Sequence, residues 1–201
     1  MSCTDCETRA CVKFEELPED CTVNLAREGA RDRAIAFYTD PANAAIVHAA
    51  SQVISPSIAE HWPRVHEIVE FARQIDAKRI GIASCSTFSK EAKMLADILE
   101  RAGFESVDAM CRIGAIRRID TGECDETHPK AFASACNPFM QAEVLNQAET
   151  DFNIILGLCL GHDMIFASNS NAWVTTLAVK DQSRTHAEII GDQLEAFLAQ
   201  G

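Results

Sequence analysis

Residues 79–103, RIGIASCSTFSKEAKMLADILERAG, decide the fold of this chain. Residues 79–84 form a short apolar run, which is typical of a buried strand. The segment that follows predicts an amphipathic helix that stops at Gly103, with five apolar residues on one face: Phe88, Ala92, Leu95, Leu99 and Ala102. A strand that leads directly into such a helix predicts an α/β fold.

The same alternation continues toward the C-terminus. We expect further strands at residues 105–110, 153–158 and 172–180, and helices at residues 138–148, 161–168 and 187–199. Right-handed crossovers between such strands produce a parallel sheet with helices on both faces. The chain is therefore expected to form a three-layer, Rossmann-like, mostly parallel sheet of about four strands.

The residues before the sheet divide into two parts. Residues 24–76 predict a helical lead-in, with Asp40-Pro41 and Trp62-Pro63 as helix starts. Residues 1–22 carry four cysteines but too few large apolar residues for a core. We therefore expect a cysteine-rich metal-binding segment at residues 1–22 and an α/β domain at residues 23–201, with its parallel sheet at residues 78–201.

Composition limits the classes of partner. The 201 residues include 30 acidic and 18 basic side chains, a formal net charge of −12. Such a charge disfavours binding to nucleic acid or to an anionic membrane surface. The sequence has no apolar run long enough for a membrane span and no apolar segment typical of a signal peptide near Met1, so we expect a cytoplasmic protein.

Nine cysteines exceed what an ordinary cytoplasmic domain of this size contains, and they indicate metal or redox chemistry. Three of them directly follow predicted strands, and Cys136 precedes the helix that begins at Pro138. Because parallel strands end at one edge of the sheet, these four thiols are expected to meet there. The sequence predicts a four-thiolate site made of Cys85, Cys111, Cys136 and Cys159.

A second group occupies the N-terminal segment: Cys3, Cys6, Cys11 and Cys21. Since this segment lacks a core, metal ligation is expected to order it. The spacing matches neither a standard zinc finger nor the bacterial ferredoxin motif. Cys124, in the irregular stretch at about 112–136, is left over as an inert thiol or a replacement ligand.

Single cysteines from separate loops suit a cuboidal cluster, so we expect [4Fe–4S] at the sheet edge and, with a weaker argument, at the N-terminus. Zinc is the alternative at both sites. His162 follows Cys159 closely and is either a proton donor beside the site or the start of a helix. His186 also falls on the side of that edge, without a local motif, and Lys180 could line the same place or end a solvated strand.

Several segments resemble one known family: SCTDCETRAC at residues 2–11, GIASC at 81–85, CNPFMQAEVLN at 136–146, and DFNIILGLCLGHD at 151–163 followed by VTTLAVKD. The chain is similar over nearly its whole length to a bacterial and archaeal domain-of-unknown-function family described as uncharacterised metal-binding proteins. The resemblance implies metal binding through the eight cysteines of the two groups, with His162 next to them. It implies no reaction, and residues 182–188, QSRTHAE, depart from the loop expected there.

Three functions remain open at this point. Two iron–sulfur sites would serve electron transfer to a redox partner protein, or, with an open iron and His162 as proton donor, a reductive reaction on a small-molecule substrate. A zinc protein would have a structural N-terminal site and a ligand pocket without redox chemistry. A thiol enzyme would use Cys136 or Cys159 as nucleophile and His162 as base.

Overall fold

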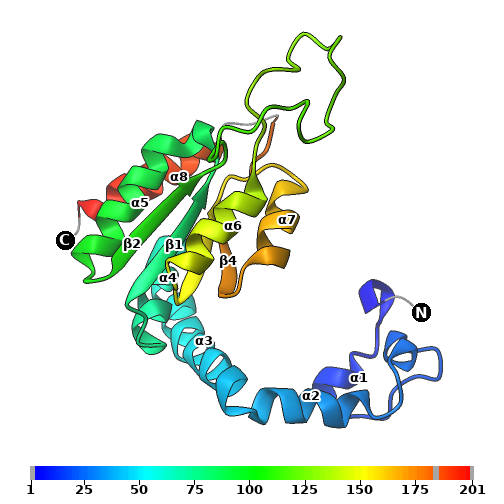
Figure 1. The fold of residues 1–201 in the computed structure, drawn as a ribbon. Coiled ribbons are helices and arrows are strands. Elements are labelled where there is room, and N and C mark those ends of the chain that lie inside the picture. Colours follow the sequence, from blue (N-terminus) through cyan, green and yellow to red (C-terminus); the bar gives the residue numbers. More distant parts are fainter. Residues whose placement is uncertain (1–2, 183–185, 200–201) are drawn as a thin grey trace. The chain divides into compact units, whose positions relative to one another are not determined.

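The computed structural model describes residues 3–182 and 186–199 of the chain (Figure 1). It divides into two compact units, residues 1–48 and 49–201. The cysteine-rich segment expected at residues 1–22 lies inside the first unit, and the helical lead-in contributes to both. The first unit contains η1 (Cys3–Asp5), α1 (Ala10–Lys13), η2 (Thr22–Leu25), α2 (Ala30–Thr39) and the start of α3 (Pro41–Glu60).

The second unit has the α/β architecture that the sequence predicts. Its strands are β1 (Arg79–Ser84), β2 (Glu105–Met110), β3 (Phe152–Leu156) and β4 (Trp173–Ala178), in the order β2-β1-β3-β4. Every neighbouring pair is parallel, because each connection crosses over through a helix. All four carboxyl ends therefore lie along one edge.

Helices cover both faces of this sheet (Figure 1). On one face, α5 (Ser89–Arg101) packs against α8 (His186–Leu198), which also contacts α4 (Arg64–Gln74). On the other face, α6 (Pro138–Gln147) packs against α7 (His162–Asn169). The short helix η3 (Ser86–Phe88) connects β1 to α5.

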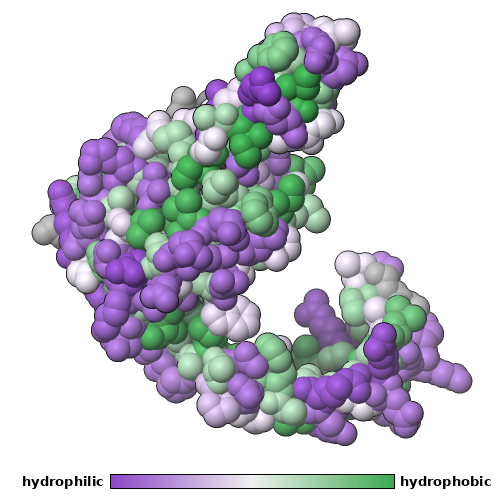
Figure 2. Space-filling model, viewed as in Figure 1, coloured by the Kyte–Doolittle hydropathy of each residue, from purple (hydrophilic) through white to green (hydrophobic). Residues whose placement is uncertain are grey.

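The core lies between the inner strands and these helices. Every residue of β3 is buried, and so is every residue of β1 after Arg79. The apolar face of α5 packs onto them through Leu95, Ile98 and Leu99, which are each at most 2% exposed. Its opposite face is hydrophilic, whereas hydrophobic side chains are exposed over α7 (Figure 2).

The structure shortens two of the expected strands. β3 ends at Leu156 instead of residue 158, because Gly157 turns the chain with a φ of 68°. β4 ends at Ala178 instead of residue 180, next to a register shift against β3. Residues 112–135 form the expected irregular loop, with one antiparallel bridge between Arg117 and Ser134. Within the described part of the chain, no helix is long and apolar enough to cross a membrane.

Candidate metal centre at the carboxyl edge of the sheet

The two inner strands and the outer strand β2 deliver three cysteines to the carboxyl edge. Cys85 directly follows β1, Cys111 directly follows β2, and Cys159 comes three residues after β3 ends. Cys136 lies two residues before α6, whose start faces the same edge. Cys85 and Cys111 are buried, with 4% and 3% of their surface exposed, while Cys136 and Cys159 are partly buried.

Backbone hydrogen bonds hold these loops together. The Cys85 N–H donates to Leu156 O at 3.1 Å, so the end of β1 is joined to the end of β3. The Asn137 N–H donates to Cys111 O at 2.6 Å, which joins the start of α6 to the end of β2. The Asn137 side chain also accepts from the Met140 N–H at 3.0 Å and caps α6.

Gly157 allows the chain to reach Cys159. A Cβ at this position would lie 2.2 Å from Phe88 Cδ2, and the positive φ is itself unfavourable for other residues. The ring of Phe88 is 3% exposed and belongs to the core behind Cys85. The close approach of this turn to Phe88 therefore fixes where the loop carrying Cys159 leaves the sheet.

Three hydrogen-bond donors point at the sulfur atoms. The Ser86 N–H lies 3.4 Å from Cys111 Sγ, and the Thr87 hydroxyl lies 3.3 Å from Cys85 Sγ. The ammonium group of Lys180, two residues after β4, donates to Cys85 Sγ at 3.2 Å. Each of these contacts stabilises a sulfur that carries negative charge.

The thiols also act on one another. Burial raises the pKa of Cys85, but the Thr87 side chain, the Thr87 backbone and Lys180 outweigh it and lower this pKa to about 7. Burial first, and then the neighbouring thiols of Cys111, Cys159 and Cys85, raise the pKa of Cys136 to about 11. Burial lowers the pKa of Lys180, yet the same three thiols raise it overall. The four sulfurs and Lys180 thus form one electrostatic group.

Gln141, on α6, joins two strand ends at this edge. The sequence alone did not identify it as a residue of the site. Its side chain is fully buried, and its Nε2 donates to Ser84 O at 3.1 Å and to Ala109 O at 2.6 Å. It therefore ties together the last residues of β1 and β2, just before Cys85 and Cys111. Gln141 shares one helix face with Pro138, Ala142 and Leu145, and a polar residue on an apolar face is the signal that could have identified it.

The donor set fits a group that binds several thiolates. Four sulfurs come from four loops, and an ammonium, a hydroxyl and a backbone N–H offset their negative charge. As the side chains stand, no three His, Cys, Asp or Glu residues among those described are placed to hold a single metal ion. Around one tetrahedral zinc ion, with Zn–S bonds of about 2.3 Å, sulfurs lie about 3.8 Å apart. A cuboidal cluster holds its ligands around a larger body.

The four N-terminal cysteines also come together. Cys3, Cys6, Cys11 and Cys21 all line one cavity of about 250 Å³ within the first unit. The Thr8 hydroxyl lies 3.5 Å from Cys6 Sγ, and hydrogen bonds from Thr8 and Arg9 lower the pKa of Cys6. The predicted grouping of these residues is thus found in the structure, while their binding of a metal stays a prediction.

Among the described side chains, neither His162 nor Cys124 makes a hydrogen bond to the four sulfurs. His162 begins α7, and its N–H donates to Cys159 O at 3.0 Å, so its backbone is joined to the site. Cys124 is partly buried in the loop between β2 and α6. The backbone of His186 opens α8, and its side chain lies outside the described part of the chain.

The fold and the site define a class: a parallel α/β protein with four cysteines gathered at the carboxyl edge of its sheet. A family model described as a protein of unknown function, DUF1847, matches residues 21–177, and the chain belongs to this family. The chain is also 34% identical over 193 residues to an uncharacterised protein of the archaeon Methanocaldococcus jannaschii. That match covers 92% of this chain and 90% of the relative. No solved structure matches.

Proposed function

We propose that this chain is a metal-binding protein with two four-cysteine sites, and that the site at the sheet edge holds an iron–sulfur cluster of the [4Fe–4S] type. Its ligands are Cys85, Cys111, Cys136 and Cys159. The observation that carries the proposal is the meeting of four thiols from separate loops, with Lys180 and two further donors directed at the sulfurs.

The origin of the four thiols in separate loops favours a cluster over zinc at this edge. Cluster sulfurs commonly accept hydrogen bonds from backbone N–H groups and nearby side chains, as Cys85 and Cys111 do here. Zinc is the alternative ion at both sites. The case for zinc is stronger at the N-terminal cysteines than at the sheet edge.

When bound, such a cluster accepts and releases one electron. The chain holds it with four thiolates, and Lys180 offsets part of their charge. Four protein ligands close the coordination, so we favour electron transfer to a redox partner protein over a reaction on a small-molecule substrate. Large apolar side chains next to the site support protein docking: Leu160 is 89% exposed, Met164 67% and Phe139 50%.

We further propose a cytoplasmic location. Reduced thiols in two clusters of four persist in a reducing compartment. Fractionation of the native host, with detection of the chain by antibody, tests this location. Recovery from an oxidising compartment with disulfide-bonded cysteines would contradict it.

The deciding experiment is anaerobic purification of the full chain, followed by iron, zinc and acid-labile sulfide analysis. We expect four iron and four sulfide per occupied cluster site, as the [4Fe–4S] composition requires. Serine variants of Cys85, Cys111, Cys136 and Cys159 should each lose the iron of the sheet-edge site. Cys124→Ser is the matched control and should retain it. A colourless protein with zinc and no sulfide overturns the proposal.

The hydrogen bonds at Cys85 favour one second candidate, a thiol enzyme. Its sulfur receives donors from Thr87 and Lys180, whereas the neighbouring thiols disfavour a thiolate at Cys136. Cys85 is therefore a better nucleophile than Cys136 in this alternative. A Cys85 that is alkylated far faster than the other cysteines, in protein that contains no iron, supports it. Uniform labelling contradicts it.

A further inference from the structure

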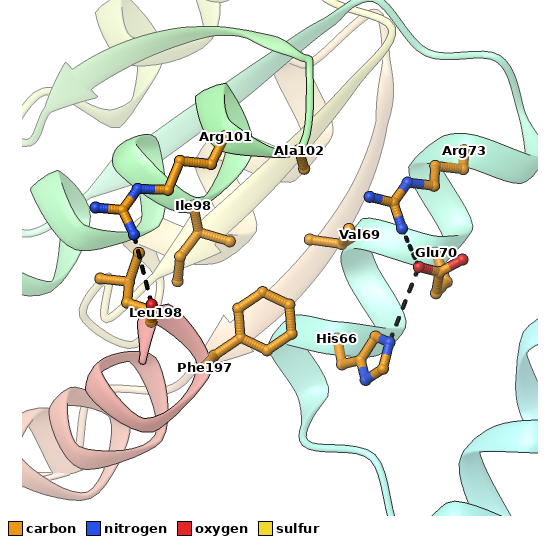
Figure 3. A pocket seen from close by; sticks show the side chains of 9 residues that line it. All are labelled: His66, Val69, Glu70, Arg73, Ile98, Arg101, Ala102, Phe197 and Leu198. Carbon is orange, nitrogen blue, oxygen red and sulfur yellow. Dashed lines mark hydrogen bonds and ion pairs between the residues drawn. The ribbon is translucent and has the colours of Figure 1, made fainter. Parts of the chain in front are cut away.

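The second unit has another feature at the opposite, amino edge of the sheet, between α4, α5 and α8. A cavity of about 320 Å³ opens there, within the second unit (Figure 3). Residues near the C-terminal ends of α4 and α5 line this cavity, and β1 and β2 begin shortly after those two ends. None of the eight candidate metal ligands lines it. A volume near 300 Å³ is at the lower end of the range of small-molecule pockets.

The floor and one wall of this cavity are apolar. Val69 and Ile98, each 2% exposed, line it, and the ring of Phe197 lies beside them (Figure 3). His66 extends the aromatic wall, since its ring contacts that of Phe197 edge-on with centroids 5.5 Å apart. A ligand body that rests here would be hydrophobic, and an aromatic ring would suit the wall.

The rim carries an excess of positive charge. Arg73 is paired with Glu70, whereas Arg101, on the other side of the cavity, has no carboxylate partner among the described residues (Figure 3). Its guanidinium makes one long hydrogen bond, 3.5 Å to Leu198 O, although it has five N–H donors to offer. In a chain with a net charge of −12, an arginine at an apolar cavity with no carboxylate partner among the described residues is an unusual feature.

We propose that this cavity binds a small monocarboxylate with an apolar body. The carboxylate pairs with the Arg101 guanidinium, which matches two oxygens in one plane, and the body rests on Val69, Ile98 and Phe197. The volume is that of roughly ten water-sized groups, so the ligand has about ten non-hydrogen atoms.

The test uses the full chain and three probes in calorimetry and ligand-detected NMR. The probes are 3-phenylpropionate, its neutral amide, and acetate, which has the charge without the body. We expect saturable binding of 3-phenylpropionate, at least tenfold weaker binding of the amide, and no saturation by acetate. Equal binding of the acid and the amide overturns the proposal, and so does the absence of saturable binding by the acid.

Two variants assign the binding to this cavity. Arg101→Met should weaken binding of 3-phenylpropionate at least tenfold, and Arg101→Lys should restore part of it. Lys93→Met, on the same helix but paired with Asp97 outside the cavity, is the matched control and should bind as the unmodified chain does. Phe197→Ala should also weaken binding of 3-phenylpropionate, through the loss of apolar contact and without a change of charge. Unchanged binding by both Arg101→Met and Phe197→Ala, in folded protein, contradicts the assignment.

Discussion

The ammonium group of Lys180 lies 3.2 Å from the sulfur of Cys85, although 95 residues separate them in the chain. β1 and β4 are both parallel to β3, which lies between them. The residues that follow β1 and β4 therefore reach the same edge of the sheet. The contact places the positive charge of Lys180 directly on one of four clustered thiols. This relationship makes Lys180 a tuning residue of the proposed cluster.

Lys180→Met should lower the reduction potential of the sheet-edge cluster by tens of millivolts. Reduction adds negative charge, and the ammonium stabilises it through both charge and hydrogen bond. A shift of about 59 mV corresponds to a tenfold change for a one-electron couple. Redox titration followed by electron paramagnetic resonance measures it.

Lys180→Arg should keep most of the potential, because it retains the charge. Lys90→Met is the control, since Lys90 is paired with Glu195 on the surface and does not contact the cysteines. A potential that is equal in Lys180→Met and in the unmodified chain would show that Lys180 has no such role.

Gly157→Ala should destabilise the second unit by about 2 to 5 kcal/mol. The positive φ costs about 1 to 2 kcal/mol and the overlap with Phe88 adds about 1 to 3 kcal/mol. The variant should also lose metal from the sheet-edge site, because the turn that carries Cys159 is displaced. Urea denaturation and iron content are the two measurements.

Gly103→Ala separates the two causes. Gly103 has a φ of 94°, and no described atom lies within 4 Å of the place its Cβ would take. Gly103→Ala should therefore lower the free energy of unfolding only by the backbone strain, about 1 to 2 kcal/mol. This variant should keep the iron of the sheet-edge site. Equal losses of stability in the two variants would rule out a contribution from Phe88.

Gln141→Leu should destabilise the protein by about 1 to 3 kcal/mol, although leucine is apolar and the site is buried. The change leaves the carbonyls of Ser84 and Ala109 without their donor in a dry environment. The strand ends before Cys85 and Cys111 should then loosen, and amide hydrogen exchange near them should accelerate. Gln147→Leu, at an exposed position of the same helix, should stay within about 0.5 kcal/mol.

Glu67 should make stability depend on pH. Burial raises its pKa, but the Ser57 hydroxyl at 2.6 Å and Arg64 at 2.9 Å outweigh burial and lower the pKa below its ordinary value. A carboxyl with a lowered folded pKa stabilises the protein above its unfolded pKa of about 4.3, and this contribution disappears as pH falls through the folded pKa.

Glu67→Gln should therefore be less stable than the unmodified chain by about 1 kcal/mol near neutral pH. The difference should shrink below about pH 4.3. Thermal unfolding across this pH range measures it, with Glu143→Gln on the surface of α6 as control. A difference that stays constant from neutral to acidic pH would mean that the Glu67 charge does not contribute.

The sequence was informative where periodicity and burial agree. The amphipathic pattern of residues 89–101 and the apolar runs of β1 and β3 identify the α/β class and the parallel sheet. Strand ends were less predictable. Leu158, Val179 and Lys180 continue the strand pattern, yet the turn at Gly157 and the register shift beside β4 end pairing earlier. Such endings depend on what packs against the turn, here Phe88.

At the candidate site, the sequence placed four cysteines at one edge because the carboxyl ends of parallel strands always share an edge. It did not distinguish Lys180 from an ordinary solvated strand end. Nor did it show that Gln141 joins two strand ends. Both roles depend on the order β2-β1-β3-β4 and on side-chain directions, which pairing across the sheet decides.

What the sequence determined by itself is the class of fold and the set of thiols, since both follow from local periodicity and from one rule of sheet topology. The tertiary structure alone decided which groups act on those thiols and that Arg101 lines an apolar cavity at the other edge. The physical reason is that hydrogen bonds and charge pairs depend on distances of a few ångström between segments far apart in the chain. No local pattern encodes those distances, and they exist only once the layers have packed.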